Sequence, residues 1–197
     1  FAADMIVEPC RLLAATPNSD GGRAIVLTSV ENAKRRGHRM AKIRGFGSAN
    51  QPDSPYRLNP ADPDSAAVRA SRAAFAMAGI TPKDVDACEL YDCFTYTVEA
   101  TLRDYGFFKP DETREFLTQE RIGPGGELPV NTSGGMLSEA YFMGMTPISE
   151  GVMQIMGRCG ARQLGKAVGK KEPEIIVCSD NGAVFQSHVT LVLEREA

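Results

Sequence analysis

The sequence predicts one α/β domain, with a mixed five-stranded sheet and helices on its faces. Short apolar runs typical of strands alternate along the chain with longer runs that have helical spacing. The chain has 197 residues, enough for one sizeable core, and its 43% apolar and 24% charged content is ordinary for a globular protein. We therefore expect residues 1–197 to form a single domain, with loop excursions at about 49–64 and 107–127.

The first expected strand is the apolar run at 23–28, which follows a glycine-containing turn. Thr28 and Glu31 have the spacing of a capping box, and this spacing predicts a short helix that ends at Gly37. Residues 40–46 alternate between apolar and polar side chains, as a half-buried strand does. The chain therefore opens with a strand, a helix and a second strand.

Four prolines and little apolar content indicate a surface loop at 49–64. Asp64 or Ser65 then caps a long alanine-rich helix that ends before Gly79, and the next apolar run, at 85–90, is the third strand. Near the C-terminus, Asn181-Gly182 is a strong signal for a two-residue hairpin. The remaining expected elements are helices at 94–105 and at 137–159, the latter interrupted near Pro147, and strands at 174–178 and 184–193.

Composition excludes several classes of function. A net charge of −3 gives no basic surface for nucleic acid, and no apolar run approaches the about 18–20 residues that span a bilayer. The five cysteines include no Cys-x-x-Cys pair, which indicates a reducing compartment and no zinc site. The N-terminus has no secretory signal, so we expect a cytoplasmic protein. Both histidines, His38 and His188, are expected at the surface.

Two segments carry the strongest functional pattern. The segment 131–144 combines paired glycines, which allow a tight turn and a close approach of a ligand to the backbone, with a phenol at Tyr141. Earlier in the chain, an apolar run ends in a second phenol, Tyr91, followed by Asp92 and Cys93. A lone tyrosine after such a turn would not be informative, and it is the second segment that makes the first one so.

Together these segments resemble the C-terminal half of the thiolase superfamily, over nearly the whole chain. The segment 20–29 is similar to the stretch that begins the second half of a thiolase, and 131–144 is similar to its Asn-x-x-Gly-Gly…Gly-His-Pro-x-Gly motif. Tyr91-Asp-Cys-Phe94 resembles the Asn-Glu-Ala-Phe motif, which often reads His-Asp-Cys-Phe in lipid-transfer-type (sterol-carrier) thiolases, and 178–184 resembles the Cys-x-Gly loop. The resemblance implies a coenzyme A thioester as substrate and no other cofactor.

The departures from the thiolase motifs point to different chemistry. Tyr141 takes the position of the histidine that activates the thiolase cysteine, and Tyr91 takes the position of the asparagine. Steroid side-chain aldolases of the lipid-transfer group resemble this chain in having a tyrosine pair there. The resemblance implies retro-aldol cleavage of a β-hydroxyacyl-CoA, in which one phenol acts as base and the other donates to the enolate, in an order that the sequence leaves open.

The resemblance also implies roles for residues around the phenols. Cys178 keeps the cysteine of the Cys-x-Gly motif, but Asp180 replaces its glycine, so we expect Cys178 to contribute at most weakly to acid–base catalysis. No metal ligands are expected. The residues expected to bind substrate are Asn131, Gly134, Gly135, Asp92 and Gly182.

Two other functions stay open: a thiolase, or acyl-CoA acyltransferase, whose nucleophilic cysteine lies in a missing N-terminal half, and a non-catalytic module that binds acyl-CoA or lipid. The chain starts at Phe1 without a methionine and reads as the middle of a sequence, so we expect it to bind an N-terminal thiolase half through an exposed apolar face. Thiolases commonly form homodimers, and some lipid-transfer-type members also pair with a small OB-fold, zinc-ribbon protein. The resemblance implies both as possible partners.

Overall fold

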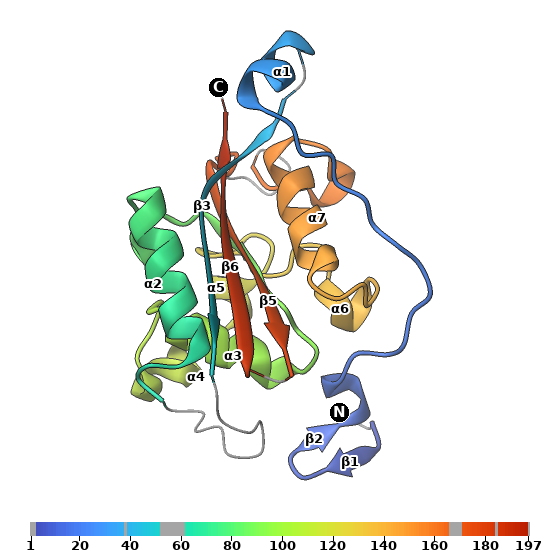
Figure 1. Ribbon diagram of the computed structural model, residues 1–197. Helices are drawn as coiled ribbons and strands as arrows, with labels where there is room; N and C mark the ends of the chain where they lie inside the picture. Colours follow the sequence, from blue (N-terminus) through green and yellow to red (C-terminus); the bar gives the residue numbers. More distant parts are fainter. Residues whose placement is uncertain (1–2, 38, 52–61, 166–170, 184, 197) are drawn as a thin grey trace.

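The computed structural model describes residues 3–37, 39–51, 62–165, 171–183 and 185–196. Its centre is a four-stranded sheet with the order β3-β6-β5-β4 (Figure 1). β3 (Ala41–Asn50), β6 (Ser187–Arg195) and β5 (Ile175–Gly182) are antiparallel neighbours, whereas β4 (Ala87–Glu89) runs parallel to β5. The sheet is mixed, as expected, and its two parallel strands end at the same edge.

Helices cover both faces of the sheet (Figure 1). α2 (Ala66–Ala78) and α3 (Thr95–Asp104) lie on one face, and α7 (Met145–Ile155) lies on the other. The expected alanine-rich helix is therefore confirmed as α2, with the Ser65 hydroxyl capping its first turn and Gly79 ending it at a φ of 64°. The expected helix at 94–105 is confirmed as α3.

α2 packs unusually close to β3 because both surfaces carry small residues. A Cβ atom added to Gly45 or to Gly47 of β3 would overlap the α2 carbonyl oxygens of Ala74 and Ala70, respectively. Both alanines are fully buried. The alanines of α2 and the glycines of β3 together allow the helix to pack close to the strand.

Alternate residues of β5 face opposite layers. Val177 packs in the core formed with α2 and α3, whereas Ile176 and Cys178 pack in the core formed with α7. The same alternation points Asp180 toward the α7 layer, where its carboxylate lies against Gly144, the residue that precedes α7. This orientation matters for the site described below.

The N-terminal part of the chain lies outside this sandwich (Figure 1). β1 (Met5–Val7) and β2 (Cys10–Arg11) form a separate two-stranded sheet, followed by the short helix η1 (Leu12–Ala14). From there the chain runs without regular structure past α6 and α7 to α1 (Val30–Arg35). Ser29 caps α1 through the amide of Asn32, which places the start of this helix one residue later than expected.

The excursion expected at 107–127 is folded into short helices and packs on the core. Phe108 and Phe116 stack with ring centroids 4.7 Å apart and are both buried.

No helix of the described ranges is long and apolar enough to cross a membrane. The remaining short helices are η3 (Pro82–Asp84), η4 (Pro110–Glu112), α4 (Thr113–Phe116), α5 (Gln119–Ile122), α6 (Gly135–Ser138) and η5 (Gly160–Arg162).

The expected strand at 23–28 is wrong, which reduces the main sheet from five strands to four. Val26 and Leu27 are 90% and 77% exposed, because this segment has no neighbouring strand with which to form a hydrogen-bonded ladder. An apolar run alone does not supply that partner. Residues 49 and 50 belong to β3, and 52–61 of the expected loop lie outside the described residues.

Three expectations about the C-terminal part are also wrong. Asn181 pairs with His188 inside the ladder, so the β5–β6 turn follows Gly182 instead of containing it. His188 is fully buried, because Tyr105 binds its Nε2 at 2.7 Å. Pro147 lies in the first turn of α7, where the missing N–H breaks no helical hydrogen bond, and the interruption falls before this helix.

Candidate active site

The two phenols expected from the sequence meet at the edge of the sheet. Tyr91 follows the end of β4, and Tyr141 lies in the loop between α6 and α7. Their hydroxyl oxygens are 2.9 Å apart, and their rings meet edge to face with centroids 6.3 Å apart. The structure therefore brings both phenols into one constellation.

Tyr91 is held by backbone contacts to the neighbouring strand and helix. Its amide donates to the hydroxyl of Ser179 on β5 at 3.1 Å, and its carbonyl accepts from the hydroxyl of Thr97 on α3 at 3.0 Å. Only 5% of Tyr91 is exposed. The end of β4 thus fixes this ring before any substrate binds.

Tyr141 is held from the other side by the N-terminal segment. Its amide donates to the hydroxyl of Ser19 at 3.2 Å. Within its own loop, the Thr146 hydroxyl donates to the carbonyl of Ala140 at 2.8 Å and accepts from the amide of Phe142 at 3.1 Å. The ring of Phe142 lies against Gly21, where a Cβ atom would overlap it. The site therefore joins three parts of the chain that are far apart in sequence.

Electrostatics favour the protonated form of Tyr91. Burial raises the pKa of this phenol far above its usual value, and the hydrogen bond with Tyr141 raises it further. Smaller contributions come from Cys93 and Asp180, whose negative forms oppose a phenolate. Tyr91 is consequently a protonated phenol at neutral pH and can donate a hydrogen bond.

The glycine-rich turn is tied to the end of β4 by two polar side chains. The Asp92 carboxylate accepts from the amide of Met136 at 2.8 Å, and the Asn131 side-chain oxygen accepts from the amide of Leu90 at 2.6 Å. Gly135 has a φ of 63°, and a Cβ atom there would overlap the Asp92 carboxylate. Asp92 and Asn131 thus position the turn, and their expected contact with substrate stays a prediction.

Gly134 and Gly182 are the other residues expected to bind substrate. Gly134 has a φ of 93° and precedes α6, beside Asn131 in the same turn. Gly182 pairs with Ser187 at the end of β5, where a Cβ atom would overlap the serine hydroxyl. Gly134 therefore lies within the glycine-rich turn that precedes Tyr141, whereas Gly182 lies at the last residue pair of the β5–β6 ladder.

Cys178 is poorly suited to the weak catalytic role expected for it. It is fully buried, and its sulfur packs against Gly151 of α7. Burial raises the pKa of this thiol well above its ordinary value, so it stays protonated. Cys93, closer to the phenols in sequence, is half-buried, and burial raises its pKa to about 11. Neither thiol is a ready nucleophile.

Sequence reasoning treated Asp180 only as a departure from the thiolase glycine. In the structure its Oδ1 atom is buried and has no hydrogen-bond partner among the described residues. Burial raises the pKa of this carboxyl. The two-residue alternation of β5, which places Asp180 on the face opposite Ser179, is the signal that would have located it in the α7 layer, beside Gly144.

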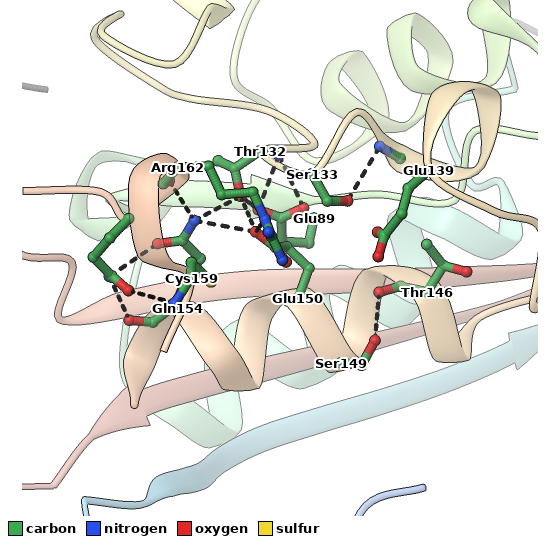
Figure 2. A network of polar contacts seen from close by, with 12 residues as sticks. Glu89, Thr132, Ser133, Glu139, Thr146, Ser149, Glu150, Gln154, Cys159 and Arg162 are labelled. Carbon is green, nitrogen blue, oxygen red and sulfur yellow. Dashed lines mark hydrogen bonds and ion pairs between the residues drawn. The ribbon is translucent and has the colours of Figure 1, made fainter. Parts of the chain in front are cut away.

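A buried polar network supports the turn from below. Figure 2 shows Glu89 and Glu150 meeting at Thr132, the residue after Asn131, with Arg162 beside Glu150. The Arg162 guanidinium binds both oxygens of Glu150, at 3.0 and 2.9 Å. Burial raises the pKa of Glu150, but its hydrogen bonds with Arg162 and Thr132 outweigh burial and lower the pKa overall. Glu150 is therefore ionised.

Glu89 is neutral at the same time. Burial and the nearby Glu150 charge raise its pKa to about 8, against hydrogen bonds from Thr132 that lower it. The Thr132 hydroxyl lies 2.7 Å from Glu89 and 2.9 Å from Glu150, and it accepts from Gln154 at 2.9 Å. One hydroxyl has one proton, so all three contacts are satisfied when Thr132 donates to Glu150 and protonated Glu89 donates to Thr132.

An apolar groove of about 780 Å³ lies on the α7 side of the sheet, away from the phenols. It is formed where the irregular N-terminal segment passes over β3 and α7. The apolar side chains that line the groove include Ile25, Leu27, Val30, Met40, Ile148 and Val152.

Within the described residues no cluster of three histidine, cysteine or acidic side chains forms a metal site.

Comparison with known proteins finds relatives among acyl-CoA enzymes. A 17-hydroxy-3-oxo-4-pregnene-20-carboxyl-CoA lyase of Mycobacterium tuberculosis is 36% identical over 156 residues, covering 77% of this chain and 40% of the relative. A steroid side-chain-cleaving aldolase of Thermomonospora curvata is 37% identical over 158 residues, with the same coverage. An acetyl-CoA acetyltransferase of Methanothermobacter thermautotrophicus is 30% identical, covering 84% of this chain and 44% of the relative. The chain thus spans less than half the length of these relatives.

Among solved structures, the "Ltp2-ChsH2(DUF35) aldolase" superposes with a TM-score of 0.84 and 31% identity, covering 98% of this chain and 50% of that chain. The model of the family described as thiolase C-terminal domain-like matches residues 57–195. These residues include both phenols and every strand of the main sheet except β3. The fold, the order of the motifs and these matches agree, and this chain belongs to the thiolase C-terminal domain-like family.

Proposed function

We propose that this chain is the C-terminal half of an enzyme that cleaves a C–C bond of a β-hydroxyacyl-CoA by a retro-aldol reaction. The observation that carries the proposal is the hydrogen-bonded pair of phenols, Tyr91 and Tyr141, at the positions of the thiolase asparagine and histidine. Retro-aldol cleavage needs a donor for the enolate oxygen and a group that handles the β-hydroxyl proton. It needs no acyl-cysteine.

The environment of each phenol supports a different role for Tyr91 and for Tyr141. Tyr91, buried and with a raised pKa, donates its proton toward the thioester oxygen as negative charge develops there. Tyr141 is half-buried, so it is the phenol that a bound acyl chain reaches first. Its hydrogen bond to Tyr91 holds the two hydroxyls at one substrate.

The substrate class follows from the relatives. Two of them act on steroid side chains, one as a lyase of a pregnene carboxyl-CoA. We assign this chain a coenzyme A thioester with a bulky, polycyclic acyl group. The proposed cleavage itself calls for no further cofactor.

A thiolase-type acyl transfer is the second candidate, because one relative is named an acetyl-CoA acetyltransferase. That reaction requires a base that activates a cysteine nucleophile. Tyr141 occupies the base position, and His188 is buried and bonded to Tyr105. Both observations favour aldol chemistry. A non-catalytic acyl-CoA module is the third candidate, and a preorganised, hydrogen-bonded phenol pair argues against it.

The groove and the exposed apolar segment suit an N-terminal thiolase half as partner. Val26 and Leu27 are largely exposed, and the groove that they border is apolar. A homodimer is also part of this proposal. The similar solved aldolase carries two protein names, Ltp2 and ChsH2(DUF35), which favours an OB-fold, zinc-ribbon partner for this chain as well.

Tyrosine-to-phenylalanine variants of the full-length enzyme test the proposal, assayed for cleavage of a β-hydroxyacyl-CoA with a steroid side chain. Tyr91→Phe and Tyr141→Phe should each reduce kcat by about 10²–10⁴-fold, because each removes a hydroxyl and leaves the ring. Tyr96→Phe is the matched control, since Tyr96 is 41% exposed and stacks on Phe94. Retained cleavage in both Tyr91→Phe and Tyr141→Phe rejects the assignment.

A further inference from the structure

The Thr132 hydroxyl links the two elements that lead to the phenols (Figure 2). On one side it lies 2.7 Å from the carboxyl of Glu89, the last residue of β4, two positions before Tyr91. On the other side it lies 2.9 Å from the carboxyl of Glu150 in α7, the helix that begins four residues after Tyr141. One buried side chain therefore joins the strand before one phenol to the helix after the other.

The end of β4 and the glycine-rich turn are fastened together at further points around this junction. The amide of Asn131 donates to the carbonyl of Cys88 at 2.9 Å, and the amide of Met136 donates to the Asp92 carboxylate at 2.8 Å. Tyr91 lies between Cys88 and Asp92 in the sequence, so a change in the way that β4 meets the turn is transmitted to this ring.

The junction has too few protons for two carboxylates. Only 1% of Glu89, 2% of Glu150 and 9% of Thr132 are exposed, so the polar contacts have to be satisfied within the protein. The Gln154 amide donates to the Thr132 hydroxyl at 2.9 Å, and this hydroxyl has one proton of its own to donate to one carboxyl. The contact with the second carboxyl is favourable only if that carboxyl supplies a proton.

Arg162 determines which carboxyl keeps the proton. Its guanidinium binds both oxygens of Glu150, at 3.0 and 2.9 Å, so Glu150 is the anion. Glu89 takes part in none of the ion pairs of the described residues. Burial and the Glu150 charge raise the pKa of Glu89 to about 8, which agrees with a protonated Glu89 at neutral pH.

The other ionisable groups around Glu89 support the same assignment. The charge of Asp92 raises the pKa of Glu89 further, because it opposes a second negative charge at the end of β4. Three thiols also interact with Glu89, and burial raises the pKa of each, so they stay neutral where Glu89 titrates: Cys88, Cys159 and Cys178.

We propose that protonated Glu89 is a positioning residue for the phenol pair: it donates to the Thr132 hydroxyl and so holds the end of β4, with Tyr91, in place relative to α7. The inference rests on the proposed retro-aldol function, in which both phenols act on one substrate. When Glu89 loses its proton, two carboxylates compete for the single proton of Thr132 and repel each other across it. The junction then weakens, and Tyr91 loses its alignment with Tyr141.

The proposal fixes the direction of a pH effect on catalysis. The phenol pair is aligned while Glu89 keeps its proton, so activity that depends on this alignment is lost as the pH rises through about 8. Glu89→Gln removes the effect. Its amide donates to the Thr132 hydroxyl and its carbonyl oxygen accepts from the Thr132 amide, as the two oxygens of protonated Glu89 do, and it stays neutral throughout.

The pH profile of the full-length enzyme tests the proposal, with a β-hydroxyacyl-CoA that carries a steroid side chain. The ratio of kcat in Glu89→Gln to kcat in the wild type should be constant from pH 6 to pH 7 and rise about tenfold by pH 9, where about one wild-type molecule in ten keeps the proton. KM should stay within about threefold. Titration of the phenols affects both proteins alike and cancels in the ratio. Circular dichroism at each pH gives the folded fraction, to which kcat is normalised.

Substitutions of Thr132 provide a second test at pH 7. Thr132→Val keeps the shape of the side chain but removes the hydroxyl, and it should lower kcat of the folded protein by about 10²-fold, because it releases β4 from α7. Thr132→Ser keeps the hydroxyl and should restore most of this loss. A purely structural role of the junction would change the stability and leave kcat of the folded fraction unchanged.

The controls separate this inference from the proposed function. Glu115→Gln, the same substitution at an exposed position of α4, should give a ratio to wild type that is constant from pH 6 to pH 9. A constant ratio for Glu89→Gln overturns the proposal, as does wild-type kcat in Thr132→Val. If Thr132→Val does not fold, the profile of Glu89→Gln decides. A constant ratio alongside inactive Tyr91→Phe and Tyr141→Phe removes only Glu89. Activity in both phenylalanine variants removes the proposed function itself.

Discussion

Glu89 should make the stability of this domain depend on pH in a direction opposite to that of most carboxylates. Its folded pKa is raised from 4.5 to about 8, so the unfolded chain releases the proton at a lower pH than the folded chain does. The stabilisation is complete below pH 4.5 and is lost as the pH rises through the folded value. Replacing Glu89 with glutamine removes this dependence, because an amide stays neutral at every pH in this range.

The magnitude follows from the two pKa values. At about 1.36 kcal/mol per pKa unit, the wild-type domain should lose roughly 2–3 kcal/mol more than Glu89→Gln between pH 5 and pH 7. The variant should fold normally at pH 5, since its amide can donate to the Thr132 hydroxyl as the protonated acid does. The difference between the two proteins cancels the contributions of titrating groups that do not interact with Glu89.

Native-state hydrogen exchange of the full-length protein, read on peptides covering β4, measures the free energy of opening at each pH. Glu115→Gln is the matched control, because it makes the same substitution at an exposed position of α4. If the difference between Glu89→Gln and wild type stays constant within about 0.5 kcal/mol from pH 5 to pH 7, Glu89 is ionised in the folded protein and the reasoning is refuted.

Two further substitutions test the scaffold of the site. Gly135→Ala should destabilise the domain by about 1–3 kcal/mol or more, because it forces a Cβ atom into the Asp92 carboxylate at a φ of 63°. Urea denaturation measures this loss. Gly125→Ala is the control, because a Cβ atom at Gly125 meets open space. Tyr105→Phe should cost about 1–3 kcal/mol, because it leaves the buried His188 and Thr190 without their shared partner; unchanged stability would show that water replaces the hydroxyl.

The sequence predicted the layers from short-range patterns and the phenol pair from the resemblance of two segments to thiolase motifs. Ser65 and Gly79 bound α2 by local capping chemistry, and motif positions were enough to bring Tyr91 and Tyr141 together in one prediction. The environment of the site depends on register and contacts over long range. The burial of His188 requires Tyr105 from another element, and no local pattern distinguishes a buried histidine of a β-strand from an exposed one.

The strand expected at 23–28 failed for a related reason. The apolar run is real, but a strand requires a neighbour, and the segment instead borders the groove over α7. The sequence analysis noted Asp180 only as a replacement for a motif glycine, because its close approach to the glycine at 144 cannot be read from its own neighbours in sequence. Hydrophobic periodicity predicts which elements form the layers. It does not predict which polar side chains come into contact between those layers.

The hydroxyl of Ser19 that receives the amide of Tyr141 belongs to an extended arm with no strand or helix of its own. A protease cut within that arm would leave every strand and helix of the sandwich uncut. The clipped protein would nevertheless lose the anchor of one phenol. For this protein, tests of intact folding and tests of chain integrity therefore measure different things, and mass spectrometry should accompany every activity assay.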